Sequence, residues 1–327
     1  MKRTSKILSI ALCLSIISSL LAACSGSSYD MPYERNMPTA AYNMNSSLTS
    51  DGTIKPFAYS LCIDDNTLYV SSEGFETSHA YGLFDLNNKS VLTGENMYEE
   101  LPPASLTKVL TALVALKYGD LSSMVTISDR CKITEPGAQL YGFKTGDTIS
   151  LEQALNVLLL YSANDVAVAI AESIGGDYDT FIQMMNDEAK ALGCTHSHFV
   201  NPHGLTAEDH YTCCYDLYLI FNQVIKYDAF REIIAKTNYS SDYIDAAGNT
   251  QTITVNSTNR FVNGSTGMPD GITVVGGKTG TTAAAGNCLI LYAKDEQGNP
   301  YISVILNSST RDDLYNDMTT LLELSSK

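Results

Sequence analysis

Alternating apolar and polar positions predict strands in two separate parts of the chain. The first group comprises Phe57–Ile63, Thr67–Ser71, Ala80–Leu86 and Ser90–Leu92, with Asn87-Asn88 as a two-residue hairpin turn between the last two. The second group comprises Gly271–Lys278, Asn287–Ala293 and Tyr301–Leu306. We therefore expect both ends of the chain to contribute strands to the structure.

Between these groups the apolar residues recur at helical spacing, broken by Gly, Pro and Asn. Helices are predicted over Ser105–Tyr118, Leu151–Ser173, Tyr178–Leu192, Cys213–Ile225 and Phe230–Lys236, and one more over Arg311–Leu324. Strands at both ends with helices between them predict an α+β fold, in which one antiparallel sheet of about five strands carries an inserted helical region. A site at the seam between sheet and helices would collect residues from distant parts of the chain.

The N-terminus has the pattern of an export signal. Basic residues precede the apolar run Ile7–Ala23, which is short for a membrane span of ~20 residues and ends in small residues before Cys24. This ending resembles a bacterial lipobox, so we expect residues 1–23 to be a signal peptide and Cys24 to carry a lipid that anchors the protein to the outer face of the membrane. The alternative is an ordinary cleaved signal with an unmodified Cys24. Residues 24–55 have the composition of a flexible tether. We expect residues 56–327 to form a single catalytic domain.

The formal net charge of −16 makes nucleic acid an unsuitable partner. An anionic substrate would have to be met by a local cation instead. Six cysteines fall in the body of the chain, and their pairing is left open: Cys62, Cys131, Cys194, Cys213, Cys214 and Cys288.

The strongest chemical signal is Ser105 followed three residues later by Lys108. Two prolines end the preceding segment, and a helix is expected to begin at the serine. Residues three apart share a helix face, so the amine can reach the hydroxyl and accept its proton if the pKa of the lysine is lowered. Apolar residues after Lys108 predict a buried helix, which favours a serine–lysine nucleophile over a capping serine beside an exposed lysine.

Two further short motifs carry polar groups into apolar or glycine-rich surroundings. Ser162-Ala163-Asn164 interrupts an apolar helix pattern, so we expect a kink that faces a site. Lys278-Thr279-Gly280 follows a strand pattern and two glycines, which allow a ligand to approach the backbone and supply the cation. Chance copies of both patterns, Ser257-Thr258-Asn259 and Lys144-Thr145-Gly146, fall in turn-like stretches and are interpreted as unrelated to the site.

With these three motifs in this order, the chain resembles the penicillin-recognising serine enzymes. The resemblance extends to the D-alanyl-D-alanine carboxypeptidases, or low-molecular-mass penicillin-binding proteins, through Ala104–Lys108, Ser162–Asp165, Asn201–Leu205, His210–Thr212 and Gly277–Thr282. It implies a β-lactamase/transpeptidase-like fold. Members often carry a further β-rich domain, which is not expected here because 47 residues follow Gly280. The pair Thr281-Thr282 has no assigned effect on substrate preference.

The resemblance also implies a mechanism. Ser105 would attack the penultimate D-Ala carbonyl of a peptidoglycan stem peptide, Lys108 would take its proton, and Ser162 would pass a proton to the leaving amine. Asn164 would hold the substrate amide and Lys108, and Lys278 with Thr279 would bind the terminal carboxylate. The N–H groups of Ser105 and Thr281 would bind the oxyanion, and Gly280 is a further substrate-binding residue. β-Lactams would acylate Ser105, and no cofactor or metal is implied.

Three other functions remain as alternatives. A class A-like β-lactamase would need a glutamate to activate water, and Glu208 lacks the surrounding pattern. A metal protein is suggested by four histidines within 15 residues, but no HExxH or paired CxxC accompanies His196, His198, His203 and His210. A solute-binding or inactive sensor lipoprotein would leave the Ser105 and Lys108 spacing unexplained.

Overall fold

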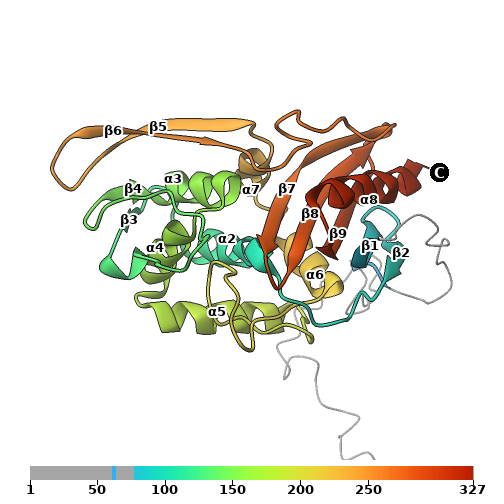
Figure 1. Cartoon of the computed structure of the whole chain (residues 1–327), viewed down its shortest axis with the longest axis horizontal. Helices are drawn as coiled ribbons and strands as arrows, with labels where there is room; N and C mark the ends of the chain where they lie inside the picture. Colours follow the sequence, from blue (N-terminus) through green and yellow to red (C-terminus); the bar gives the residue numbers. More distant parts are fainter. Residues whose placement is uncertain (1–60, 64–76, 327) are drawn as a thin grey trace, which may run out of the picture. The chain divides into compact units, whose positions relative to one another are not determined.

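Strands from the two ends of the described chain form one antiparallel sheet (Figure 1). The computed structural model describes residues 61–63 and 77–326, and the strand order is β2-β1-β9-β8-β7. Its strands are β1 (Ser78–Asp85), β2 (Ser90–Glu95), β7 (Ile272–Thr282), β8 (Gly286–Asp295) and β9 (Pro300–Ser308). The predicted five-stranded sheet is confirmed, and the two groups of strands join where β1 pairs with β9.

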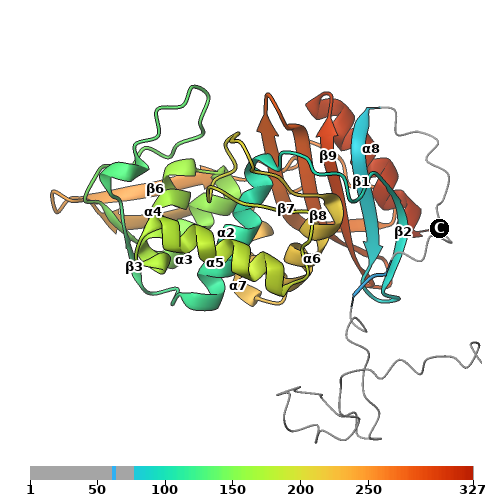
Figure 2. The same cartoon turned by 90° about the horizontal axis from the view of Figure 1, so that it is seen from below.

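Both faces of this sheet are buried, because alternate residues of each strand point to opposite sides. Tyr81 and Leu83 of β1 pack in one apolar cluster with the last helix, α8 (Arg311–Glu323). Ala80 and Phe84 belong to the larger cluster on the other face, where α6 contacts β1 and β9. Figure 2 shows α8 and the other helices on opposite sides of the sheet. The sheet is thus a middle layer, which holds β7 rigidly against the helical region.

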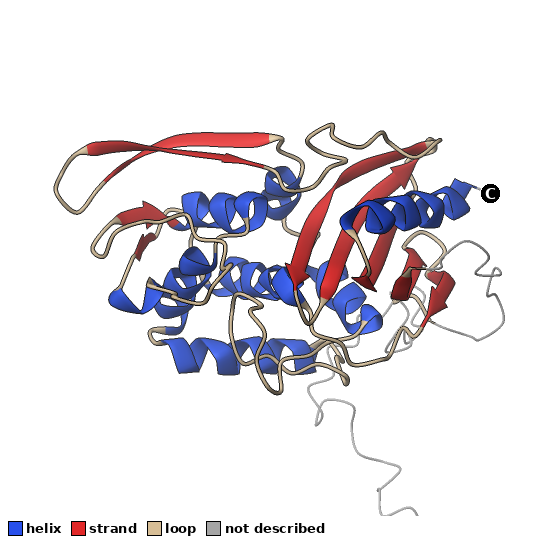
Figure 3. Cartoon of the chain, viewed as in Figure 1, coloured by secondary structure: helices blue, strands red, loops and turns tan. Residues whose placement is uncertain are grey.

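The helical region lies between β2 and β7 in the sequence. Figure 3 shows its helices in blue next to the red strands of the sheet. Its helices are α2 (Thr107–Tyr118), α3 (Leu151–Asn156), α4 (Asn164–Gly175), α5 (Tyr178–Ala191), α6 (Cys214–Val224) and α7 (Asp228–Ile234). Helix α2 contacts α4, α5 and α6, and its residues from Thr107 to Ala115 are all buried. Within the described part of the chain, no helix combines the length and apolarity needed to cross a membrane.

Two features of the helical region differ from the predicted elements. The helix predicted over Leu151–Ser173 is divided into α3 and α4 by the expected break at Ser162, and a π-helical turn at Val157–Tyr161, which was not predicted, precedes this break. Short strands were also missed, namely β3 (Met124–Thr126), β4 (Thr148–Ser150), β5 (Asn238–Ile244) and β6 (Thr250–Asn256). The β5–β6 hairpin is mostly exposed and polar, and within it only Ile253 and Val255 of β6 are buried, so its apolar alternation is too short to predict a strand.

The turn between β1 and β2 is longer than the predicted two-residue loop. The Asp85 carboxylate accepts hydrogen bonds from the backbone N–H groups of Asn87 and Asn88, and Ser90 begins β2. The position of the turn is confirmed, although four residues rather than two connect the strands. Such local side-chain to backbone bonds are typical of Asp in turns.

The predicted signal peptide, the tether and Cys24 lie outside the described residues, as does most of the strand pattern at Phe57–Ile63 and all of that at Thr67–Ser71. Ile63 forms an isolated bridge with Ser90. All described residues belong to one unit that begins at Ala58, and the six cysteines of the body are buried free thiols.

Candidate active site

A strained backbone step presents Ser105 at the start of α2. Ala104 has a φ of +47°, in the left-handed region that side chains other than Gly rarely adopt, and it opens the 3₁₀ turn Ala104–Leu106. Gly204, also left-handed at +87°, lies against this step so closely that a Cβ atom there would come within 1.9 Å of the Ala104 carbonyl oxygen. The segment that ends at Gly204 therefore supports the backbone of the nucleophile directly.

The side chain of Lys108 connects three parts of the site. Its Nζ atom lies 2.9 Å from Ser105 Oγ, 2.7 Å from Asn164 Oδ1 and 2.5 Å from the carbonyl oxygen of His203. The predicted approach of amine and hydroxyl across one helical turn is confirmed. Two of the three partners come from segments that are 56 and 95 residues away.

These three contacts match the hydrogen-bonding capacity of a neutral amine. The Asn164 and His203 oxygens can only accept, so two N–H bonds of the amine are directed at them. The lone pair is then left for the hydroxyl hydrogen of Ser105. Complete burial lowers the pKa of Lys108 well below its usual value, the nearby Lys278 lowers it further, and Asp165 opposes the shift. Lys108 is thus prepared to accept the serine proton.

The kink between α3 and α4 turns two polar side chains toward Lys108 and Lys278. Ser162 has a φ of +68°, and its Oγ atom accepts a hydrogen bond of 2.9 Å from the Nζ atom of Lys278. Asn164 begins α4, and its backbone N–H donates to the carbonyl oxygen of Gln139 at 2.8 Å. The break expected from three polar residues in an apolar run is therefore present, and it faces the site.

Strand β7 supplies the opposite wall of the site. Lys278 is buried, and its Nζ atom also donates to the carbonyl oxygen of Thr279 at 2.8 Å. Burial lowers the pKa of Lys278 to about 7. At Gly280, a Cβ atom would lie 3.0 Å from the backbone nitrogen of Ser105, so the glycine allows β7 to approach the nucleophile closely.

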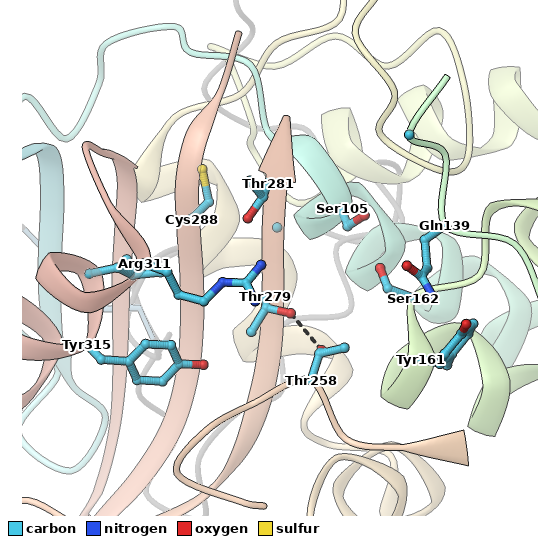
Figure 4. A pocket seen from close by; sticks show the side chains of 13 residues that line it. Ser105, Gln139, Tyr161, Ser162, Thr258, Thr279, Thr281, Cys288, Arg311 and Tyr315 are labelled. Atoms are coloured by element: carbon cyan, nitrogen blue, oxygen red, sulfur yellow. Dashed lines mark hydrogen bonds between the residues drawn. The ribbon is translucent and has the colours of Figure 1, made fainter. Parts of the chain in front are cut away.

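A pocket of about 390 Å³ opens between these two walls (Figure 4). Its lining includes Ser105, Ser162, Thr279, Gly280 and Thr281 from the predicted site, and also Gly137, Gln139, Tyr161, Thr258, Cys288, Arg311, Leu314 and Tyr315. Figure 4 shows Arg311 and Tyr315 on the side of β7, with Gln139 and Tyr161 on the opposite side. The serines lie between a cationic end and an uncharged polar end.

The comparison with known families agrees with this geometry. The profile of the D-alanyl-D-alanine carboxypeptidase family matches residues 70–310, which is most of the chain. The chain belongs to this family. Among its curated relatives, DacF of Bacillus subtilis is 32% identical over 248 residues, which are 74% of this chain and 60% of the relative. DacC of Escherichia coli is 31% identical over 255 residues, 75% of this chain and 60% of the relative. The chain thus spans about three fifths of the length of these carboxypeptidases.

Solved structures share the fold. A variant of a Streptomyces DD-transpeptidase is 25% identical with a TM-score of 0.70, over 76% of this chain and 97% of that chain. The D-alanyl-D-alanine carboxypeptidase DacD of Francisella tularensis is 24% identical with a TM-score of 0.65, over 76% and 70% of the two chains. The β-lactamase/transpeptidase-like architecture expected from the sequence is confirmed.

In this family member, residues 196–210, which contain four histidines, contact the site through hydrogen bonds. His210 Nε2 lies 2.9 Å from Thr107 Oγ1, and its Nδ1 atom accepts the N–H of Val200 at 3.0 Å. Burial lowers the pKa of His203 to about 3 and that of His210 to about 4, so both rings are neutral. In the described residues, the four histidines do not converge on one point, because His196 alone belongs to a group of clustered ligand atoms.

Sequence patterns did not identify several residues that line the pocket of this carboxypeptidase family member. Arg311 is an exposed cation, whereas Lys278, the cation expected for the carboxylate, is buried and donates to Ser162 and Thr279. Thr258, inside the motif copy interpreted as unrelated, lies 2.7 Å from Thr279 between their hydroxyl oxygens, so that segment does border the site. The other motif copy, Lys144-Thr145-Gly146, is a turn before β4, as predicted. No local pattern marks Arg311 or Thr258, because only the tertiary fold brings them to β7.

Proposed function

We propose that this protein is a serine D-alanyl-D-alanine carboxypeptidase that removes the terminal D-Ala from peptidoglycan stem peptides. The observation that carries this proposal is the position of Lys108 Nζ, 2.9 Å from Ser105 Oγ and bonded to two acceptors. This arrangement activates a hydroxyl for acyl transfer without a histidine. The names of the curated relatives supply the substrate class.

In the proposed acylation step, Ser105 Oγ forms a bond to the carbonyl carbon of the penultimate D-Ala while its proton passes to Lys108 Nζ. The oxyanion would lie between the backbone N–H groups of Ser105 and Thr281. The close approach at Gly280 supports this, since it brings the two backbones together. Each such donor is worth ~3–4 kcal/mol in acyl transfer.

The bond to the terminal D-Ala then breaks, and the leaving nitrogen must gain a proton. Ser162 is suited to deliver it, because its Oγ atom is held by Lys278 Nζ at 2.9 Å and borders the same pocket as Ser105. Ser162 would recover a proton from Lys278, whose pKa of about 7 permits exchange near neutrality. Water attacks the acyl-enzyme, and transfer of the proton back to Ser105 regenerates the hydroxyl.

The charge distribution of the pocket orients the substrate. The terminal carboxylate is the anionic end of the peptide, and we place it at Thr279, Thr258 and Arg311 on the side of β7. Arg presents several N–H donors in a planar array that suits a carboxylate. Lys278 would add positive charge near the carboxylate without contacting it, because it is buried with its amine bonded to Ser162 and Thr279.

The acyl part of the peptide must then extend to the opposite side of Ser105. There Gln139 and Tyr161 line the pocket and offer an amide and a phenol to the peptide backbone. Asn164 supplies a further amide beside Lys108, although its Oδ1 atom is already taken by the lysine. Its side-chain NH₂ group remains suited to the carbonyl of the substrate amide.

A β-lactamase reading receives no support from the pocket lining. Rapid deacylation would call for a carboxylate that activates water, and no Asp or Glu is among the described residues that line the pocket. A β-lactam would therefore acylate Ser105 and leave slowly. Glu208 is exposed on the loop after Gly204 and does not line the pocket.

We further propose that the protein is exported and held at the outer face of the cell membrane by a lipid on Cys24. The support is the apolar run of 17 residues before Cys24 and the basic residues ahead of it. In cells that express the full chain, Cys24→Ser should move the protein from the membrane fraction to the soluble fraction. Retention of the Cys24→Ser protein in the membrane at the level of the unaltered chain would reject the lipid anchor.

The enzymatic proposal is tested with the catalytic domain, residues 56–327, termed the soluble domain, by reaction with a β-lactam and intact-protein mass spectrometry. A stable adduct on Ser105, absent in Ser105→Ala, together with D-alanine release from a peptide that ends in D-Ala-D-Ala, would support it. Ser123→Ala, which changes an exposed serine, is the matched control. An adduct that hydrolyses within seconds would favour the β-lactamase instead. Folded protein that forms neither adduct nor D-alanine would reject both readings and favour a binding protein.

A further inference from the structure

Three metal-binding side chains converge at the N-terminus of α6, outside the active-site pocket. His196, Cys213 and Asp216 each offer one ligand atom, and these three atoms lie within 4.8 Å of one another. Cys213 and Asp216 are buried, whereas His196 is half-buried and leaves one side accessible. We propose that this group, termed the α6 site, binds one zinc ion.

The chemistry of the three groups suits zinc better than a harder cation. Thiolate, imidazole and carboxylate are all ligands that Zn²⁺ takes in tetrahedral sites, whereas Ca²⁺ and Mg²⁺ prefer oxygen ligands alone. The thiolate of Cys213 and the carboxylate of Asp216 would balance the two positive charges of the ion. A neutral assembly of this kind can be buried at lower cost than an isolated charge.

Neighbouring hydrogen bonds already orient each ligand. The Oδ2 atom of Asp216 accepts from the backbone N–H of His196 at 2.8 Å and from Ser197 Oγ at 2.7 Å. The Sγ atom of Cys213 accepts the backbone N–H of Asp216 at 3.4 Å, and His196 Nδ1 lies 3.0 Å from Thr195 Oγ1. Such outer contacts orient ligands at metal centres and tune their affinity. They leave Asp216 Oδ1, the remaining Sγ lone pairs and His196 Nε2 as the atoms to bind the ion.

The fit requires a small adjustment. Zinc–ligand bonds of 2.0 to 2.3 Å at tetrahedral angles separate ligand atoms by ~3.6 Å. The present limit of 4.8 Å is wider by about 1 Å, which rotation of the half-buried His196 ring can supply. The fourth position would be taken by water on the accessible side of His196. Binding would release the thiol proton of Cys213.

Zinc binding is tested on the soluble domain, kept reduced and freed of metal by a chelator. Titration with Zn²⁺ against a chromogenic chelator should give one site per chain, and Co²⁺ in its place should show thiolate charge-transfer and tetrahedral bands. Cys213→Ser is the informative variant, because serine retains the helix N-cap while it removes the thiolate. His196→Ala removes the accessible ligand. Each variant should bind Zn²⁺ at least tenfold more weakly.

Two control variants separate this site from incidental binding. His198→Ala removes a neighbouring histidine, and Cys131→Ser removes a buried cysteine, and neither residue belongs to the α6 site. Both controls should bind zinc as the unaltered domain does. Zn²⁺ should also raise the melting temperature of the unaltered domain but not that of Cys213→Ser. Circular dichroism and the cooperativity of thermal unfolding verify that each variant is folded. Absence of one-to-one binding, or binding that Cys213→Ser and His196→Ala leave unchanged, would overturn the proposal.

Discussion

The amine of Lys108 and the hydroxyl of Ser105 lie 2.9 Å apart across one helical turn. Two other oxygens accept the N–H groups of the neutral amine, so its lone pair faces the hydroxyl. One acceptor is a side chain at the start of α4, and the other is the main-chain carbonyl of His203. The proton acceptor of the site is therefore held by three segments of the fold. Displacement of any one of them should change the basicity or the direction of this amine.

Replacement of Lys108 by Arg should abolish rapid acylation. Arginine retains a positive charge at all accessible pH values and cannot accept the serine proton. Because a positioned general base contributes 10²–10⁴-fold, the rate constant for β-lactam acylation should fall by about that factor. Lys132→Arg, at an exposed lysine, is the control and should react normally. Acylation of Lys108→Arg within tenfold of the original rate would show that another group serves as the base.

The pH dependence of acylation should reveal the coupling between the two buried lysines. Neutral Lys108 is the reactive form, so the rate should rise with pH through the lowered pKa of this residue and become constant above it. The cation of Lys278 contributes to that lowering. Lys278→Gln should therefore raise the pKa of Lys108, so that the pH-dependent rise of the acylation rate (the rising limb) moves to higher pH, whatever happens to the maximal rate. Lys294→Gln, at an exposed lysine of β8, should leave the limb in place. A limb that stays or moves to lower pH in Lys278→Gln would contradict the assignment of Lys108 as the base.

Arg311 should determine affinity for the peptide carboxylate more than the rate of the chemical step. A hydrogen bond to a charged group is worth ~1.5–3 kcal/mol, so Arg311→Gln should raise KM by about 10- to 100-fold while kcat changes little. The measurement is D-alanine release from a D-Ala-D-Ala peptide over a range of concentrations. Arg130→Gln, at an exposed arginine on the turn after β3, serves as the matched control. A normal KM for Arg311→Gln would place the carboxylate elsewhere.

Gly204→Ala should destabilise the protein beyond the cost of backbone strain alone. Its Cβ atom would meet the Ala104 carbonyl oxygen at 1.9 Å, in addition to occupying a left-handed conformation. Gly176→Ala isolates the strain, since φ there is +77° but no atom lies within 4 Å of the added carbon. Strain costs ~1–2 kcal/mol, and overpacking adds ~1–3 kcal/mol. Urea unfolding should give the larger loss for Gly204→Ala, and equal losses in the two variants would exclude the contact with Ala104 as the cause.

Much of the site could be predicted from the sequence, because its motifs are local. The spacing of Ser105 and Lys108 sets their approach on any helix, and the polar interruption at Ser162 requires a break or a partner in an apolar run. The sheet was likewise predictable, since β1, β8 and β9 are mostly buried and rich in apolar residues, and β7 begins with apolar residues before its glycines. The β5–β6 hairpin was not, because most of its residues are exposed and polar, and only Ile253 and Val255 alternate into the core.

Only the tertiary structure decided which distant groups complete the pocket. Arg311 lies in a helix more than 200 residues after Ser105, and it reaches the site because β9 ends beside β8 and delivers α8 there. The main-chain carbonyl of His203 accepts a hydrogen bond from Lys108, and a main-chain contact of this kind cannot be predicted from the residue type. The burial that lowers the pKa of Lys108 also depends on packing from α4 and β7. The sequence by itself determined the approach of Ser105 and Lys108 and the architecture, since these follow from local spacing and hydrophobic pattern. The orientation and charge of the pocket follow from long-range packing.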